Sequence, residues 1–169
     1  MDAQPDTTRL FLALWPDDAV RDQLRAWRDA WTWPRGATPV HTAKLHVTLH
    51  FLGNQPTARL PDLLDGFQVP FDSFRLQFGR AELSHNGIGW LAPHGEPRGL
   101  LDLHARLSDA LLALGLTPEA RTYRPHVTMA RRANGAGVPA SGPQIDWAIG
   151  HYALVESRAG AYTVLKEYS

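Results

Sequence analysis

The chain has 169 residues, of which 44% are hydrophobic and 20% are charged, and its 17 basic and 17 acidic side chains cancel. This composition is typical of one folded globular domain. It argues against a disordered chain and against a general electrostatic binder of nucleic acids. The sequence contains no cysteine, which excludes disulfides, thiolate metal sites and a cysteine nucleophile.

No apolar run in the sequence approaches the roughly 20 residues that a membrane-spanning helix needs. The segment Met1–Thr8 is polar and lacks the cationic start and apolar stretch of a signal peptide. We therefore expect a soluble, cytoplasmic protein. We also expect a monomer, although no feature of the sequence determines the oligomeric state.

The first third of the chain predicts a strand, a helix and a second strand. The apolar run Leu10–Trp15 is typical of a buried strand. Asp17 is suited to cap a helix that continues to about Trp31. Residues 45–52 alternate strictly, which predicts a strand with two different faces. One face would carry Leu45, Val47, Leu49 and Phe51, and the other His46, Thr48 and His50.

The remaining elements follow from the same kind of patterning. We expect a short helix at 57–66, a helix at 100–114, a mobile loop at 133–143, and strands at 74–79, 89–92, 126–130, 148–156 and 162–168. Gly115 is suited to the position just after the helix at 100–114. The order β-α-β-α-β-β-α-β-β-β predicts an α+β fold with much antiparallel sheet.

The tripeptide His-Val-Thr occurs twice, as His46-Val47-Thr48 and as His126-Val127-Thr128, 80 residues apart. With this composition, chance predicts far fewer than one copy, so the duplication is informative. Both copies lie in strand-like segments, and each follows a unit that contains a helix. This arrangement indicates an internal repeat of about half the chain.

Each copy of the motif would present an imidazole and a hydroxyl on the same face of its strand, because residues two apart point the same way. If an approximate twofold axis relates the halves, both pairs converge on one small ligand. Two histidines near neutral pH can serve as general acid and general base. Two threonine hydroxyls can donate hydrogen bonds to anionic oxygens. This set predicts in-line displacement at phosphorus, without a metal or a nucleophilic side chain.

The segments His46–Gly53 and Arg124–Arg131 resemble the paired motifs of the 2H phosphoesterase superfamily. Within it they resemble the RNA 2′,3′-cyclic phosphodiesterase family, which is also called 2′-5′ RNA ligase-like. The opening Arg9–Leu14 and the closing Leu154–Ser157 are similar to that family as well. The resemblance covers nearly the whole chain, and its paired motifs are more specific to the superfamily than to a substrate.

The resemblance implies one bilobal domain over residues 1–169. Its two lobes would be related by a pseudo-twofold axis, each with an antiparallel sheet and outer helices, and an active-site cleft would lie between them. It implies opening of a 2′,3′-cyclic phosphate on RNA ends or nucleotides to a 2′-phosphate, with no cofactor. By resemblance, His46 is the general acid on the 3′ oxygen and His126 the general base on water. Strand alternation leaves that assignment open. Some members also join a cyclic phosphate to a 5′-hydroxyl as a 2′-5′ linkage.

Two arginines and a third histidine are further candidates near the motifs. Arg131 is a candidate phosphate contact, because a guanidinium suits phosphate, although strict alternation places it opposite His126. Arg124 shares the face of His126 but precedes a proline. His50 would share the face of His46, either as an added acid-base group or as a residue at the rim of the cleft.

Three aromatic residues, Tyr123, Trp33 and Trp90, could stack on a nucleobase, and packing within the fold is the alternative for each. His46 and His50 have the four-residue spacing of a zinc-binding helix. Val47 stands where that motif needs glutamate, and the segment has a strand pattern, so we expect no metal site.

Two alternatives to this enzyme remain open from the sequence. One is a binding module for RNA ends or cyclic nucleotides that keeps the cleft without turnover. The other is the same chemistry on another cyclic or 2′-5′ phosphoester.

Overall fold

The computed structural model describes residues 6–169, so most of the polar segment Met1–Thr8, which the sequence suggests is not a signal peptide, lies outside the described residues. No helix in the described part of the chain is long and apolar enough to cross a membrane. The elements, in chain order, are β1 (Thr7–Leu14), α1 (Asp18–Ala30), β2 (Thr38–Pro39), η1 (Thr42–Lys44), β3 (Val47–Pro56), η2 (Thr57–Arg59), α2 (Leu60–Gly66), β4 (Phe74–Leu83), β5 (Gly89–Pro93), α3 (Arg98–Ala113), β6 (Val127–Arg131), β7 (Ile145–Ile149), β8 (Tyr152–Arg158) and β9 (Ala161–Tyr168).

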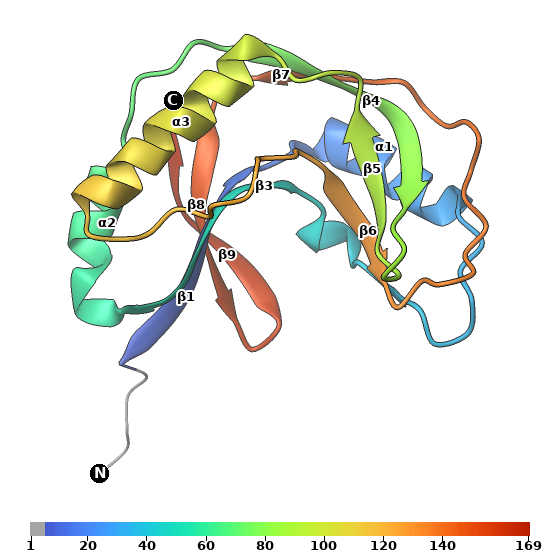
Figure 1. Cartoon of the computed structure of the whole chain (residues 1–169), viewed down its shortest axis with the longest axis horizontal. Helices are drawn as coiled ribbons and strands as arrows, with labels where there is room; N and C mark the ends of the chain where they lie inside the picture. Colours follow the sequence, from blue (N-terminus) through green and yellow to red (C-terminus); the bar gives the residue numbers. More distant parts are fainter. Residues whose placement is uncertain (1–5) are drawn as a thin grey trace.

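All the strands belong to one antiparallel sheet with the order β7-β4-β5-β6-β3-β1-β8-β9, and β2 pairs with β6. The sheet has two parts (Figure 1), which we call half-sheet A (β3, β1, β8 and β9) and half-sheet B (β6, β5, β4, β7 and β2). The β3–β6 ladder joins them, and its register consists of the single pair Val47–Val127. The predicted α+β fold with antiparallel sheet is confirmed.

Each half-sheet is covered by a helix on the face that forms the core. In Figure 1, α3 lies across half-sheet A and α1 across half-sheet B, in agreement with the contacts of α3 with β3 and of α1 with β7. Helix α1 begins as predicted, with the Asp17 carboxylate accepting a hydrogen bond from the Val20 N–H at 2.8 Å. Helix α3 is followed by Gly115 in the left-handed region, at φ +79°.

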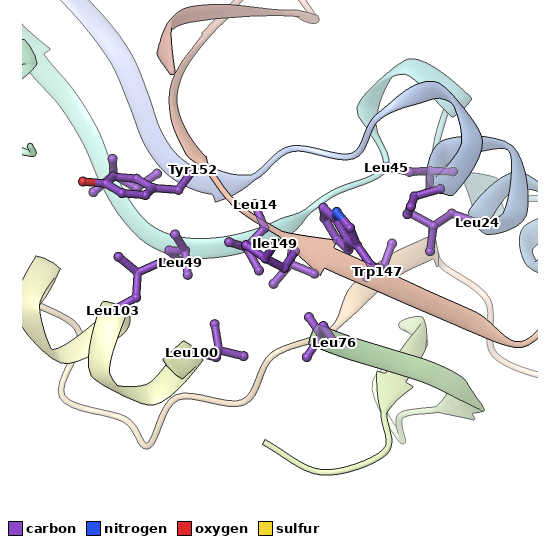
Figure 2. Close-up of a cluster of buried hydrophobic side chains, with 14 of the residues drawn as sticks. Leu14, Leu24, Leu45, Leu49, Leu76, Leu100, Leu103, Trp147, Ile149 and Tyr152 are labelled. Carbon is purple, nitrogen blue, oxygen red and sulfur yellow. The ribbon is translucent and has the colours of Figure 1, made fainter. Parts of the chain in front are cut away.

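The main hydrophobic core is continuous across the two half-sheets. Figure 2 shows Leu49, Leu103 and Tyr152 on the side of half-sheet A, and Leu76 and Trp147 on the side of half-sheet B. Every one of these side chains is less than 5% exposed. A smaller apolar cluster of Phe11, Ala13, Ala153 and Val155 covers the opposite face of half-sheet A.

The prediction that residues 45–52 alternate strictly between two faces is wrong for the second half of that segment. The register between β1 and β3 shifts so that Leu12 pairs with His50 but Ala13 pairs with Thr48, which leaves Leu49 as the extra residue of a bulge. Beyond the bulge the two faces exchange. His50 is therefore buried on the α3 side, at 5% exposure, whereas Phe51 is turned outward and is 67% exposed.

The strand predicted at 148–156 is in fact two strands that belong to different half-sheets. β7 ends at Ile149 and pairs with β4, whereas β8 begins at Tyr152 and pairs with β1 and β9. Gly150 lies between them. The loop expected at 133–143 runs along α1, where Thr32 bridges Gly137 and the Trp27 indole donates to the Pro143 carbonyl at 2.6 Å.

Candidate active site

The two His-Val-Thr motifs meet at the junction of the half-sheets. Val47 and Val127 are paired across β3 and β6, and both are fully buried. In an antiparallel ladder this register directs Thr48 toward His126 and His46 toward Thr128. Because strand neighbours point to opposite faces, these four polar side chains emerge on the side of the sheet opposite to the buried valines. The fold thus brings together the four residues that the sequence singled out.

The imidazole of His46 lies among aromatic rings of half-sheet A. It stacks on Phe11 with 4.9 Å between ring centroids and on Trp15 at 5.7 Å, and Tyr162 meets it edge-on at 5.7 Å. Phe11 also lies 6.4 Å from the exposed ring of Phe51. Aromatic side chains therefore line one side of the face that carries the two motifs.

Two hydrogen bonds fix the orientation and the tautomer of His46. Its Nδ1 lies 2.6 Å from the carbonyl oxygen of Lys44, and its Nε2 lies 2.9 Å from the hydroxyl of Thr48. A carbonyl oxygen only accepts, so Nδ1 carries the proton and donates it. The neutral ring therefore has its lone pair on Nε2, where the Thr48 hydroxyl donates.

The surroundings of His46 favour its neutral form in the free protein. Burial lowers the pKa of His46 from 6.5 to about 4, against the opposing effect of the Lys44 carbonyl. The positive charge of Arg21, followed by His126 and Arg131, lowers it further. A bound anionic phosphate would act in the opposite sense and favour the imidazolium form.

His126 has the same local bond but a more open position. Its Nδ1 lies 2.9 Å from the carbonyl oxygen of Arg124, which again places the proton on Nδ1 of the neutral ring. The side chain is exposed, and the ring of Trp90 lies 5.5 Å away. The Trp90 indole donates to Glu82 at 2.8 Å, and Trp90 pairs with Thr128 in the sheet. A backbone carbonyl thus orients the ring of His126 as it does that of His46, but the ring of His126 is accessible to solvent.

Two arginines, Arg21 and Arg131, place positive charge near His46. Arg21 donates to the carbonyls of Thr42 and Leu45 at 2.8 and 2.9 Å, and it lies over the ring of Trp15. Arg131 is exposed, and its charge contributes to lowering the pKa of His46. Arg124 contributes its carbonyl oxygen rather than its guanidinium to the described contacts of His126. Sequence reasoning missed Arg21, because the helical pattern alone does not show which loop a helix will contact.

Tyr123, His104 and His50 form a stack of three rings behind the site. His104 lies between the other two rings, at 4.0 Å from each. His50 Nε2 lies 3.0 Å from the His104 carbonyl, and the Tyr123 hydroxyl donates to the Thr48 carbonyl at 2.8 Å. Burial lowers the pKa of His50. Burial, together with the charge of His50, lowers the pKa of His104 to about 4. His50 is therefore neither an added acid-base group nor a rim residue.

Zinc binding through His46 and His50 is excluded by their placement, because the bulge sends the two rings to opposite faces of β3. Within residues 6–169, no group of three metal-ligating side chains lies close together.

Trp33 stacks on Trp31 with centroids 4.7 Å apart and packs against the core. Of the three aromatic residues considered for stacking on a base, only Trp90 lies beside a motif histidine.

Comparison with known proteins gives the same assignment at the level of a family. Residues 16–160 match the family model of the 2′-5′ RNA ligase superfamily. The chain is similar to the RNA 2′,3′-cyclic phosphodiesterases of Escherichia coli (29% identity, 95% of this chain and 96% of the relative) and Thermus thermophilus (32%, 95% and 89%). Among solved structures, E. coli LigT complexed with 3′-AMP superposes with a TM-score of 0.85, at 28% identity over 96% of this chain and 97% of that chain.

Proposed function

Because this chain belongs to the 2′-5′ RNA ligase superfamily and its curated relatives are RNA 2′,3′-cyclic phosphodiesterases, we propose that it hydrolyses 2′,3′-cyclic phosphates on RNA ends or nucleotides. The product is a 2′-phosphate. The observation that carries the proposal is the pairing of Val47 with Val127, which gathers two imidazoles and two hydroxyls on one face. Such a set suits an ester of phosphorus, because it offers both proton transfer and donors for anionic oxygens.

In the proposed reaction, a water oxygen attacks phosphorus and the bond from phosphorus to the 3′ oxygen breaks. His126 accepts the proton of the attacking water at Nε2. His46 donates a proton from Nε2 to the departing 3′ oxygen, which becomes a hydroxyl. Thr48 and Thr128 donate hydrogen bonds to the non-bridging oxygens, where negative charge is concentrated in the transition state. One proton enters the histidine pair and one leaves it, so the pair needs only a proton exchange with solvent before the next turnover.

His46 must be protonated for this role, although its surroundings favour the neutral form in the free protein. The incoming phosphate supplies the missing negative charge and raises the affinity of His46 for a proton. The Thr48 hydroxyl, which donates to Nε2 of the neutral ring, is then released to donate to the phosphate. Substrate binding and protonation of His46 are therefore coupled, with no step that needs a metal.

Product analysis tests the proposal. The purified protein is incubated, in the presence of EDTA, with a 2′,3′-cyclic mononucleotide and with a short RNA that ends in a cyclic phosphate. We expect 2′-phosphate from both, and release of 3′-phosphate would contradict the assignment of the 3′ oxygen as the leaving group. Binding without turnover would instead identify a binding module. Loss of activity in EDTA would contradict the metal-independent mechanism.

The same geometry fits joining of two RNA ends, in which a 5′-hydroxyl replaces water as the attacking group. The bond from phosphorus to the 3′ oxygen breaks in both reactions, so His46 and His126 keep their roles. An RNA with a free 5′-hydroxyl, added to the cyclic-phosphate RNA, should then yield a 2′-5′ linkage in competition with hydrolysis. Absence of this product would limit the chain to hydrolysis.

A further inference from the structure

A cavity of about 420 Å³ lies beside the catalytic face and has no part in the proposed hydrolysis. It is formed between η1, which directly precedes the first motif, and the turn between β8 and β9. The lining residues are His41, Ala43, Lys44, Gly160, Ala161 and Tyr162. Its volume lies within the usual range for small-molecule sites.

Two residues that line the cavity also contact His46. Tyr162 lines the cavity and also meets the His46 ring edge-on at 5.7 Å. Lys44 also lines the cavity, and its backbone carbonyl accepts the hydrogen bond of His46 Nδ1. A group bound in this cavity would therefore be a close neighbour of a phosphate held between the two motifs.

Lys44 gives the cavity a positive charge that is available to a ligand. Its ammonium lies 5.1 Å from the centre of the Tyr162 ring. Within residues 6–169, no carboxylate lies within ion-pair distance of this ammonium. An ammonium of this kind commonly binds phosphate as a point charge.

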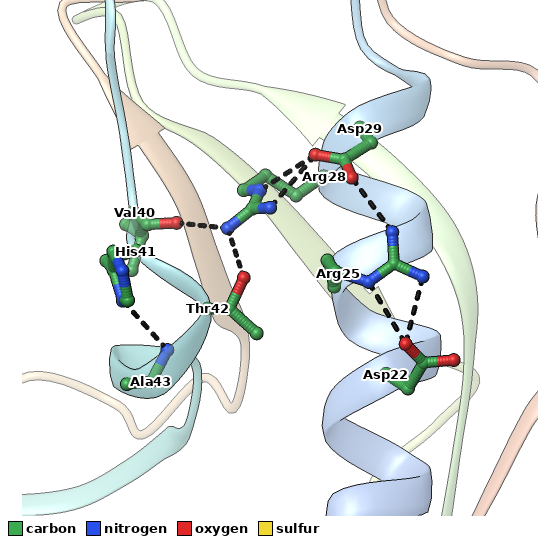
Figure 3. Close-up of polar contacts among 8 residues, drawn as sticks. All are labelled: Asp22, Arg25, Arg28, Asp29, Val40, His41, Thr42 and Ala43. Carbon is green, nitrogen blue, oxygen red and sulfur yellow. Dashed lines mark hydrogen bonds and ion pairs between the residues drawn. The ribbon is translucent and has the colours of Figure 1, made fainter.

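His41 adds a hydrogen-bond donor to the same cavity. Figure 3 shows its ring accepting the Ala43 N–H, and the atom that accepts is Nδ1, at 3.2 Å. The proton of the neutral ring is therefore on Nε2, which can donate. The segment is held in place by Arg28, which donates to the Val40 carbonyl at 2.9 Å and to the Thr42 hydroxyl at 2.8 Å. A rigid lining reduces the entropy that a bound ligand must offset.

A second cavity, of about 440 Å³, is less suited to an anion. It is lined in part by Arg75 and Glu96. Arg75 is already paired with Asp146 through two hydrogen bonds of 2.9 and 3.0 Å. Its positive charge is thus largely neutralised, and Glu96 adds a negative one.

We propose that the cavity beside Lys44 binds the RNA phosphodiester on the 5′ side of the nucleotide that carries the cyclic phosphate. This inference rests on the proposed hydrolysis. A 2′,3′-cyclic phosphate ends its strand, so the neighbouring phosphate can lie only on the 5′ side. Lys44 and His41 would bind its oxygens, and the chain would select RNA ends over mononucleotides.

Three substrates test this site by kcat/KM. They are a cyclic mononucleotide, a dinucleotide with a normal phosphodiester and a cyclic end, and the same dinucleotide with an uncharged methylphosphonate link. We expect the wild-type protein to prefer the charged dinucleotide over the methylphosphonate by about two- to fivefold, the effect of one favourable exposed ionic contact. Lys44→Met should reduce this ratio to about one, and Lys44→Arg should keep most of it.

Lys166→Met is the matched control, because Lys166 is the only other lysine and lies over a tyrosine ring in the same way, 5.2 Å from the centre of Tyr168. It should keep the wild-type ratio. An equal ratio in the wild-type protein and Lys44→Met, or no preference in the wild type, would overturn the proposed site while hydrolysis of the mononucleotide still supported the proposed function.

If no substrate is hydrolysed, the proposed function fails and the site is judged by binding. The probe is then the dinucleotide 2′-phosphate, measured by calorimetry with the phosphodiester and with the methylphosphonate link. The site would be supported if Lys44→Met binds the charged form more weakly than the wild-type protein and Lys166→Met do. Equal binding of the charged form by the wild-type protein and Lys44→Met would overturn it.

Discussion

The hydroxyl of Tyr123 donates a hydrogen bond to the backbone carbonyl of Thr48 at 2.8 Å, so a residue from the segment leading to the second motif holds the backbone of the first. Tyr123 lies three residues before His126. The ring of Tyr123 is in turn stacked on His104 of α3. The two motifs are therefore connected by a side-chain contact as well as by the pair Val47–Val127.

Tyr123→Phe removes this connection and keeps the stacked ring. It should therefore lower kcat several-fold, which is more than its small effect on stability would explain. Loss of one hydrogen bond typically costs about 0.5–1.5 kcal/mol of folding free energy. Steady-state kinetics and denaturant unfolding of the same variant separate the two effects. Tyr168→Phe is a control, since it removes a comparable bond, to the Leu64 carbonyl at 2.8 Å, that involves neither motif. Equal loss of kcat in both variants would show that Tyr123 has only a structural role.

The roles of the two histidines can be separated by the leaving group. His46→Ala and His126→Ala should each lower kcat by about 10²–10⁴, the usual contribution of one acid-base group. A 3′-thio analogue of the cyclic phosphate has a sulfur leaving group that needs no protonation. It should restore most of the activity of His46→Ala and little of that of His126→Ala. The reverse pattern would exchange the two assignments.

Removal of either threonine hydroxyl should be milder for binding than for turnover. Thr48→Val and Thr128→Val should reduce kcat by up to about 10²–10³, because each removes one donor to the charge that develops on phosphate oxygens. Thr48→Ser and Thr128→Ser keep the hydroxyl and should recover most of the rate. Rates near wild type in the valine variants would show that other groups bind these oxygens.

Acid should destabilise the folded protein through its buried histidines. The folded-state pKa values of His46 and His104 are lowered from 6.5 to about 4, so the unfolded chain binds more protons in this interval. The free energy of unfolding should therefore fall as the pH decreases from 6.5 toward 4. His104→Phe keeps a ring between His50 and Tyr123 but cannot be protonated, so it should reduce this slope. Denaturant unfolding at several pH values measures the slope, and an unchanged slope would contradict the assignment to His104.

The placement of each motif histidine beside its threonine was predictable because it depends on short-range alternation. Two copies of one tripeptide in strand-like segments place each histidine on the same side as its threonine. Nothing in the local pattern marks the bulge at Leu49, because the bulge is fixed by pairing with β1. Phe51 has the pattern of a core residue and His50 that of an exposed one, and the bulge reverses both.

The contacts that surround His46 were less predictable, since they arise between distant segments. Arg21 lies on the predicted helix, but its binding to the Thr42 and Leu45 carbonyls depends on how that helix packs. Tyr162 reaches His46 from the last strand. The division between β7 and β8 did have a local signal, which was Gly150.

Half-sheet A combines strands from the two ends of the chain, because β1 pairs with β8 from Arg9–Ser157 to Ala13–Ala153. Pairing of segments so far apart closes a large loop and is intrinsically slow to form. During synthesis, Phe11 and His46 leave the ribosome long before Tyr162. The imidazole therefore acquires its complete aromatic environment only after β8 and β9 dock, so the appearance of activity would report the docking of these two strands.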